Sequence, residues 1–168
     1  MKLVVLTGAS GSGKTAIAEM IERDRPGFAD VLRFDRIGVP KPEEMVAGWG
    51  SGEAWQRAAT LDWMTTIAAM QPFIRPVLFE GQMRLSFIRE GLTSAGLGAF
   101  RILLVDCDDE TRTRRLRTFR NQPELASRDM MNWAAFLRRE AREGGYEVLD
   151  TSGKTLEESV DHVCARLR

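Results

Sequence analysis

Short apolar runs alternate with longer amphipathic stretches along the chain. The runs contain β-branched and large aliphatic residues, and a turn or a polar cluster follows each of them, as is typical of buried strands. They cover residues 3–6, 31–34, 77–79, 102–105 and 146–149. Strands that alternate with helices form parallel sheets whose faces the helices cover. The pattern therefore predicts an α/β fold.

Three stretches around these runs have the spacing of amphipathic helices. Apolar residues at positions 17, 20 and 21 form one face of the first helix, which ends near Pro26. A longer helix is expected over residues 53–70. The last helix begins with Thr155 and Glu158, which have the spacing of a capping box. We expect the first and last helices to pack on the sheet.

Residues 38–52 interrupt this alternation after the second strand. The segment contains two prolines and four glycines, which favour irregular backbone. One interpretation is a surface loop with a short helix over residues 43–47. The other is an insertion that faces a substrate.

The composition is that of an ordinary folded protein without net charge. The 168 residues include 24 Lys plus Arg against 24 Asp plus Glu, and 43% are hydrophobic. This length suits one compact domain over residues 1–168, with enough apolar side chains for a core. Zero net charge gives no overall field that would attract nucleic acid or an anionic membrane. Binding partners must therefore be sought in local features.

The cysteines and the apolar runs indicate the compartment. The chain has only two cysteines, and no group of residues has the spacing of zinc ligands. The apolar stretch at the N-terminus is too short for a signal peptide, and no run approaches the roughly 18 apolar residues of a membrane span. The sequence therefore predicts a cytoplasmic protein without a membrane segment.

A glycine-rich loop directly after the first strand is the most specific motif of the chain. Residues 8–15 read Gly-Ala-Ser-Gly-Ser-Gly-Lys-Thr and match G-x-x-x-x-G-K-[ST] at every fixed position. Its backbone N–H groups and the start of the following helix can surround phosphate oxygens, Lys14 can reach the β- and γ-phosphates, and Thr15 can bind Mg²⁺. The predicted phosphate-binding residues are Gly8, Ser10, Gly11, Ser12, Gly13, Lys14 and Thr15.

Phosphoryl transfer to a hydroxyl needs a group that accepts its proton. The single histidine, His162, lies far along the chain on the last helix, so the base is expected to be a carboxylate. Asp35 follows the second strand, at the sheet edge where ligands of parallel sheets bind. The alternative is that Asp35 caps a loop or pairs with Arg36.

The third predicted strand also ends in polar residues. Glu80 could hold a water molecule on Mg²⁺ or orient the acceptor, and Gly81 could allow a substrate to approach the backbone. Arg84 could bind an anionic acceptor. Alternatively, Arg84 is the exposed start of a helix.

Arginines cluster after the fourth predicted strand. Arginine makes up 20 of the 24 basic residues, and five arginines fall within residues 112–120. Its planar side chain can bind phosphate bidentately, although a GC-rich coding bias would produce the same excess. One or two of these arginines could neutralise charge near the γ-phosphate, and Arg128 could approach from another side. The alternative is a solvated helix whose arginines pair with Asp109 and Glu110.

These features together resemble the small P-loop kinases, which include adenylate, shikimate and gluconate kinases and chloramphenicol phosphotransferase. The segment from Glu80 to Arg84 has the spacing of the Asp-Gly-Phe-Pro-Arg segment of nucleoside monophosphate kinases, whose arginine binds the acceptor phosphate. Asp35 looks like the acid that binds or deprotonates the acceptor hydroxyl in shikimate kinase. Arg115 and Leu116 resemble the Arg-Leu pair at the start of the lid, and Arg120 lies one residue off the usual spacing.

The resemblance implies a three-layer fold with a five-stranded parallel sheet in the order 2-3-1-4-5 and an arginine-rich lid over about residues 112–128. Residues 150–153 are similar to the loop that contacts adenine in these kinases. The remaining site residues are then assigned as follows: Lys14, Asp35, Arg115 and Arg120 to catalysis; Arg112, Thr151 and Gly153 to the nucleotide; Asp35, Glu80, Gly81, Arg84 and Arg128 to the acceptor; and Thr15, with Glu80 through water, to the metal.

The sequence thus predicts an ATP- and Mg²⁺-dependent kinase that phosphorylates the hydroxyl of a small molecule. Two alternatives stay open. A regulatory nucleotide switch would use the same loop, although the Asn-Lys-x-Asp motif expected of a GTPase is not present in the sequence. A polynucleotide 5′-hydroxyl kinase would use the arginines along a nucleic-acid backbone, and the zero net charge argues against it.

Overall fold

The computed structural model describes residues 3–168 and contains one five-stranded sheet. Its strand order is β2-β3-β1-β4-β5, and the neighbouring strands pair in parallel, as expected. Because parallel neighbours end at one edge of the sheet, the segments that follow β1 to β5 meet there. The strands are β1 (Leu3–Thr7), β2 (Asp30–Arg33), β3 (Val77–Gly81), β4 (Phe100–Asp106) and β5 (Glu147–Asp150).

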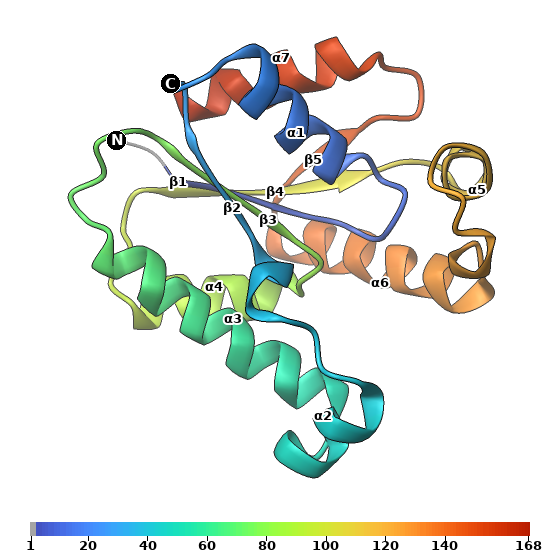
Figure 1. Ribbon diagram of the computed structural model, residues 1–168, viewed down its shortest axis with the longest axis horizontal. Helices are drawn as coiled ribbons and strands as arrows, with labels where there is room; N and C mark the ends of the chain where they lie inside the picture. The colour runs from blue at the N-terminus through green and yellow to red at the C-terminus, as the bar shows by residue number, and fades with distance from the viewer. Residues whose placement is uncertain (1–2) are drawn as a thin grey trace.

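Helices cover both faces of this sheet and give the expected three layers. Figure 1 shows α1 and α7 on one face and α3, α4 and α6 on the other. The α-helices are α1 (Lys14–Asp24), α2 (Pro42–Trp49), α3 (Gly52–Ala69), α4 (Leu85–Ser94), α5 (Asp109–Arg114), α6 (Arg128–Gly144) and α7 (Leu156–Leu167). Shorter turns are the 3₁₀ turns η1 (Phe34–Ile37) and η3 (Pro123–Leu125) and the π turn η2 (Arg115–Phe119).

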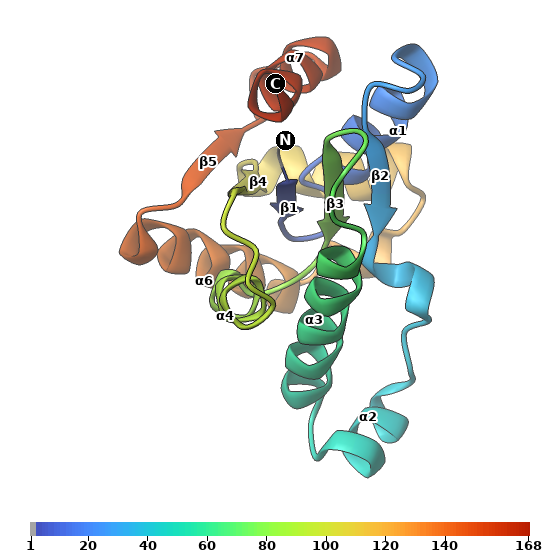
Figure 2. The same cartoon turned by 90° about the vertical axis from the view of Figure 1, so that its left-hand side faces the viewer.

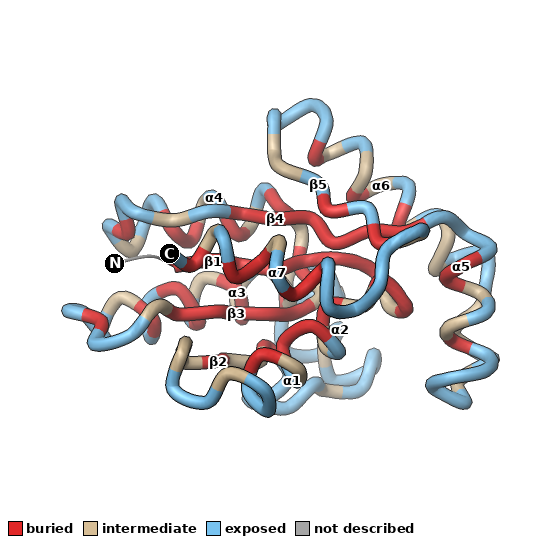
Figure 3. The backbone as a smooth tube through the Cα atoms, turned by 90° about the horizontal axis from the view of Figure 1, so that it is seen from above, coloured by how far each residue is buried: buried red, intermediate tan, exposed pale blue. Residues whose placement is uncertain are grey.

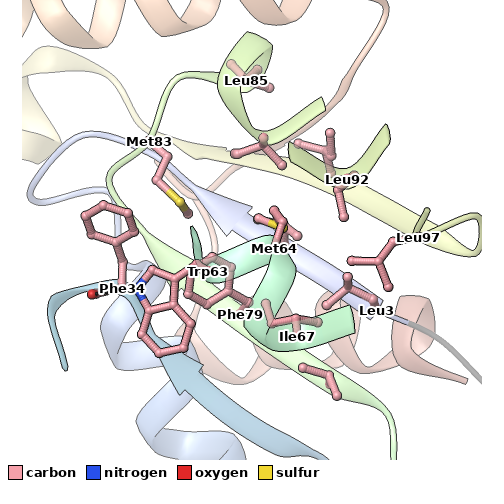
Figure 4. Close-up of a cluster of buried hydrophobic side chains, with 14 of the residues drawn as sticks. Leu3, Phe34, Trp63, Met64, Ile67, Phe79, Met83, Leu85, Leu92 and Leu97 are labelled. Carbon is pink, nitrogen blue, oxygen red and sulfur yellow. Dashed lines mark hydrogen bonds between the residues drawn. The ribbon is translucent and has the colours of Figure 1, made fainter. Parts of the chain in front are cut away.

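Two hydrophobic clusters fill the space between the layers. Alternate residues of β1 point to opposite faces, so Val5 joins the cluster under α3, α4 and α6 and Val4 joins the one under α1 and α7. Figure 3 shows that the central strands are buried along their length, and Figure 4 shows the first cluster around Phe79 and Trp63. The Trp63 indole N–H donates to the Phe34 carbonyl at 3.1 Å, which fixes the chain just after β2.

Several sequence predictions about the helices are confirmed. The long helix is α3, and the last helix begins with the expected capping box, in which the Glu158 amide donates to Thr155 Oγ1 at 3.1 Å and the Thr155 amide to Glu158 at 2.8 Å. Residues 38–52 contain the short helix α2, which projects away from the sheet (Figure 2). Within residues 3–168, no helix combines the length and the hydropathy needed to cross a membrane.

Candidate functional site

The glycine-rich loop joins β1 to α1 at the carboxyl edge of the sheet. A Cβ atom on Gly8 would lie 2.2 Å from the Val105 carbonyl oxygen, so only glycine permits this close approach of two backbones. Gly13 has a φ of +104°, in the region that glycine alone adopts easily, and directs the chain into α1. Ser12 Oγ is buried and has no hydrogen-bond partner among residues 3–168. A loop with an unpartnered buried hydroxyl next to a helix N-terminus fits a phosphate group.

Lys14 occupies the first position of α1, and its side chain is buried. Burial is the largest influence and lowers the pKa of its ammonium group. The carboxylates of Glu80 and Asp35 counteract this shift by raising the pKa, whereas the charge of Arg120 lowers it further. Lys14 therefore lies between acidic groups from the β2 and β3 ends and a basic group from the η2 region.

Glu80 is the penultimate residue of β3 and lies next to the beginning of α1. Thr15 Oγ1 donates to Glu80 Oε2 at 3.5 Å, and Arg33 Nε lies 3.9 Å from Glu80 Oε1. The side chain is buried, and this burial raises the pKa of the Glu80 carboxyl, against the lowering effects of Lys14 and Arg33. A threonine hydroxyl and a carboxylate at this distance form an oxygen donor set that fits Mg²⁺.

Asp35 lies on η1, directly beyond β2. Arg33 of β2 is in register with Glu80 of β3, so η1 starts beside the end of β3. The Asp35 side chain is exposed, and it makes no hydrogen bond or ion pair within the part of the chain that the structure describes. The expected alternative pairing with Arg36 is not formed. The negative charge of Asp35 raises the pKa of both Lys14 and Glu80. These three groups therefore lie close enough to form one site.

A cavity of about 590 Å³ lies beside the loop on the α7 side. Three segments far apart in sequence enclose it: the glycine-rich loop with the start of α1, the η2 region, and the β5–α7 connection. The lining residues are Gly11, Gly13, Lys14, Thr15, Ala16, Ile17, Glu19, Arg115, Phe119, Arg120, Thr151, Lys154, Thr155, Leu156 and Ser159. Its lining combines the apolar side chains of Ile17, Phe119 and Leu156 with residues of the phosphate-binding loop. This combination suits a nucleotide, whose base is apolar and whose phosphates are charged.

Arg115 and Thr151 tie the walls of this cavity together. Arg115 donates from Nη1 to Thr151 Oγ1 at 2.8 Å and to the Ser12 carbonyl at 3.1 Å, and from Nη2 to the Thr151 carbonyl at 2.9 Å. The Thr151 hydroxyl lies 2.8 Å from the Ser12 carbonyl oxygen, to which it donates. Gly153, the other residue expected at the nucleotide from this connection, is not among the lining residues, whereas its neighbour Lys154 is.

Arg112 holds the backbone of the glycine-rich loop through a hydrogen bond. Its side chain is completely buried; it donates to the Ser10 carbonyl at 2.8 Å and pairs with Asp106 at 2.7 Å. Arg138 of α6 binds the second oxygen of the same carboxylate at 2.5 Å. Arg112 therefore fixes the backbone of the loop and does not line the cavity.

The π turn η2 explains the unusual spacing of Arg120. The Arg120 amide donates to the Arg115 carbonyl, five residues earlier, at 3.1 Å. In an α-helix of 3.6 residues per turn, residues five apart point about 140° away from each other. The wider π turn brings residue i+5 back over residue i, so Arg115 and Arg120 both line the cavity.

Three residues that the sequence assigns to the acceptor contact other parts of the protein instead. Arg84 pairs with Glu53 at 2.8 Å. A Cβ on Gly81 would lie 2.4 Å from the Phe34 Cβ, so this glycine allows η1 to pack on β3. Arg128 lies with Arg114, Arg117 and other residues in a separate open hollow between the η2 region and α6.

Sequence reasoning did not single out Asp106, Leu156 or Ser159. Asp106 could have been noticed as an acidic residue at the end of a predicted strand, like Glu80. Leu156 and Ser159 carry no comparable signal, since they look like ordinary residues of a capped helix.

Comparisons with known proteins show what this arrangement resembles. No protein-family model matches the sequence, and no curated protein matches it. Solved structures do match over nearly the whole chain. A gluconokinase from Sinorhizobium meliloti 1021 is 17% identical, with a TM-score of 0.68 and coverage of 99% of this chain and 91% of that chain. The tunicamycin resistance protein of Deinococcus radiodurans is 19% identical, with a TM-score of 0.67 and coverage of 98% and 94%.

A shikimate kinase from Acinetobacter baumannii, in complex with shikimate, is 13% identical, with a TM-score of 0.62 and coverage of 96% of this chain and 89% of that chain. At these identities the likeness concerns the fold. The chain has the fold of small P-loop kinases, as its loop motif and strand order indicate.

Proposed function

We propose that the protein is an ATP- and Mg²⁺-dependent kinase that transfers the γ-phosphoryl group to the hydroxyl of a small molecule. The observation that carries this proposal is the grouping of Lys14, Thr15, Glu80 and Asp35 around the glycine-rich loop, next to a cavity of nucleotide size. The fold shared with the gluconokinase and the shikimate kinase supports it. The free, buried cysteines agree with the reducing cytoplasm as its compartment.

Most residues of the site would bind ATP and its metal ion. Loop amides and Lys14 would bind the β- and γ-phosphates, and Thr15 with Glu80 would hold Mg²⁺, which neutralises phosphate charge when bound. The apolar part of the cavity would take the base. Arg115 and Arg120 of the η2 region, which line the cavity, would act as part of a lid that covers the phosphates and excludes water.

Asp35 would accept the proton of the acceptor hydroxyl. The hydroxyl oxygen forms a bond to the γ-phosphorus, the bond from this phosphorus to the β–γ bridging oxygen breaks, and ADP leaves with that oxygen. The exposure of Asp35 suits this role, because the carboxylate remains accessible to an incoming hydroxyl.

A panel of candidate acceptors tests the proposal. ADP release is measured with ATP and Mg²⁺ in the presence of sugars, polyols, aminoglycosides, nucleosides and oligonucleotides, and compared with the rate without acceptor. We expect one class of small hydroxyl compounds to raise the rate of ADP release. Lys14→Ala and Asp35→Asn should each reduce this acceptor-dependent rate by a factor of about 10² or more. Asp62→Asn, which changes an exposed aspartate on α3, serves as the matched control.

The same measurements distinguish the alternatives. Slow hydrolysis that no acceptor stimulates would favour a regulatory nucleotide switch. Stimulation by oligonucleotides, with steep dependence on salt, would favour a polynucleotide kinase. An acceptor-dependent rate that Lys14→Ala leaves intact would contradict the proposal.

A further inference from the structure

Arg84, the obvious group for binding an anionic acceptor, is engaged within the protein. Its guanidinium donates to Glu53 of α3 at 2.8 Å. It also lies over two aromatic rings, 4.7 Å from the centre of Phe136 and 5.4 Å from that of Phe87. The neighbouring backbone is fixed as well, because the Arg84 amide donates to Gln56 Oε1 at 3.1 Å. An incoming anion would have to displace a carboxylate to reach this guanidinium.

The N-terminus of α4, next to Arg84, already has its own anion. Glu140 of α6 accepts from the Leu85 amide at 2.8 Å and from the Ser86 amide at 3.1 Å. These are the free N–H groups that would otherwise attract a carboxylate or phosphate of a substrate. The second anion-binding feature at this edge is therefore occupied by a side chain of the protein.

Arg33, the cation at the end of β2, is also paired away from Asp35. Arg33 forms an ion pair with Glu22 of α1, and the charge of Arg36 lowers the pKa of the same Glu22 carboxyl. Lys41, at the start of α2, is followed by two acids in the first turn of that helix. Arg33 and Arg84 near Asp35 and Glu80 are thus paired within the protein, whereas Arg36 and Lys41 are exposed and form no ion pair within residues 3–168.

Apolar side chains are concentrated on the segment that follows Asp35. Of the nine large hydrophobic residues that are exposed within residues 3–168, four fall within positions 37–49. They are Ile37 (52% exposed), Val39 (55%), Val46 (59%) and Trp49 (46%). Met45 on the same helix instead packs toward the core, so α2 is anchored by one face while these side chains remain accessible. We call these four residues the apolar segment.

We infer that the acceptor is a hydroxyl compound that carries no negative charge and has an apolar portion. The inference rests on the proposed kinase function. Asp35 would bind the reacting hydroxyl, and the apolar segment would cover the hydrophobic part of the same molecule. Because Arg84, the α4 N-terminus and Arg33 are engaged within the protein, an anionic acceptor would find only the exposed Arg36 and Lys41 as cations after β2. It would also lie close to two carboxylates, which disfavours it.

The test uses matched acceptors that differ in one property. They are 4-nitrophenyl β-D-glucoside, which is uncharged and has an aryl group, 4-nitrophenyl β-D-glucuronide, which adds a carboxylate, and methyl β-D-glucoside, which lacks the aryl group. Gluconate, shikimate and 1-phenyl-1,2-ethanediol extend the comparison to other shapes. Thermal unfolding is followed with each compound in the presence of Mg²⁺ and a non-hydrolysable ATP analogue, and ADP release is measured with ATP.

We expect the uncharged aryl compounds to raise the unfolding temperature and the rate of ADP release more than their charged or non-aryl partners. The double variant Val46→Ser/Trp49→Ser should raise the apparent KM or Kd of the aryl compounds by about tenfold, without changing the affinity for ATP. Ile74→Ser, which changes an exposed apolar residue before β3, is its matched control.

A second variant tests the role of charge through a gain of binding. Glu53→Gln frees the Arg84 guanidinium and should lower the apparent KM or Kd for the glucuronide or gluconate by about tenfold. Glu90→Gln, which breaks the other α3–α4 ion pair, to Arg57, is the control.

Three outcomes would overturn the inference: preference of the wild type for the anionic compounds, no stabilisation by any compound, or equal effects of Glu53→Gln and Glu90→Gln. The first would leave the kinase proposal intact. Failure of the kinase proposal itself would appear differently, as binding of the aryl compounds without any acceptor-dependent ADP release from the full panel.

Discussion

Lys14 is buried among groups of both charges, and burial lowers the pKa of its ammonium. The unfolded chain keeps this group charged up to its ordinary pKa, so at neutral pH the folded protein bears the cost of burying a charge. Lys14→Met should therefore raise the unfolding temperature measured without nucleotide, by about 2–4 °C for each kcal/mol recovered. The same variant should lose the stabilisation that ATP and Mg²⁺ give to the wild type.

Lys41→Met, which removes an exposed lysine outside the cavity, should change neither quantity. A lower unfolding temperature for Lys14→Met without nucleotide would mean that the attraction of Lys14 to Glu80 and Asp35 outweighs the cost of burial.

Glu80 should make the stability of the protein depend on pH. Because burial raises the pKa of its carboxyl, the folded state holds this proton to higher pH than the unfolded state does. The stabilising contribution is complete below the unfolded pKa of 4.5 and is lost as pH rises through the higher folded value. Glu80→Gln should therefore gain stability relative to the wild type as pH rises from about 4 to neutrality.

Urea unfolding at several pH values, with the exposed Glu43→Gln as control, measures this difference. A pH-independent difference between Glu80→Gln and the wild type would show that the pKa of the Glu80 carboxyl is the same in the folded and the unfolded protein.

At the residue level, the sequence predicted the glycine-rich loop fully but not the partners of the arginines. The loop is a local motif, since one short segment contains every group that it needs. The surroundings of Arg112, Arg84 and Arg128 depend on Asp106, on Glu53 and on the hollow beside α6, which packing alone brings near. An arginine that is buried under the loop and one that lines the cavity look the same in the sequence.

Among the elements, η2 departs most from what a sequence pattern can indicate. All five strands and the helices α1, α3 and α7 follow from hydrophobic spacing, whereas a π turn contains the same residue types as an α-helix. It accounts for the extra residue between Arg115 and Arg120 and still directs both side chains into the cavity. Whether Arg120 reaches the cavity thus depends on the face of the turn on which it lies, and not on the number of residues that separate it from Arg115.

Deletion of Thr118 tests this interpretation of η2. The deletion shortens the turn to α-helical spacing, in which residues four apart share a face, so the arginine should still reach the cavity. We expect the affinity for ATP, measured by titration calorimetry, to stay within about threefold of the wild type, whereas Arg120→Ala should weaken it by about tenfold or more.

Insertion of an alanine after Thr118 should weaken ATP binding as much as Arg120→Ala does, because it moves the arginine to a different face. If the deletion and the insertion lower the affinity equally, the π turn itself, and not the register of Arg120, is required.

At the scale of the whole molecule, the cavity exists because three distant segments are linked at one edge of the sheet. Arg115 and Thr151 link the η2 region and the β5–α7 connection to the loop. Arg112 links the loop to β4 and, through Asp106, to α6 on the opposite face. The strand order follows from a family resemblance, but these links could not be predicted, because each joins residues that come together only in the folded chain.

Arg112→Met measures how much the molecule depends on such a link. The substitution leaves Asp106 with Arg138 as its remaining ion-pair partner within residues 3–168 and removes the donor to the Ser10 carbonyl. Breaking a buried ion pair from one side costs about 3–5 kcal/mol, which chemical denaturation should detect as a loss of unfolding free energy. Arg114→Met, on an exposed side chain of the same helix, should cost less than about 0.5 kcal/mol. Equal stability of the two variants, together with weaker ATP binding by Arg112→Met alone, would instead assign Arg112 to the nucleotide, as the sequence first indicated.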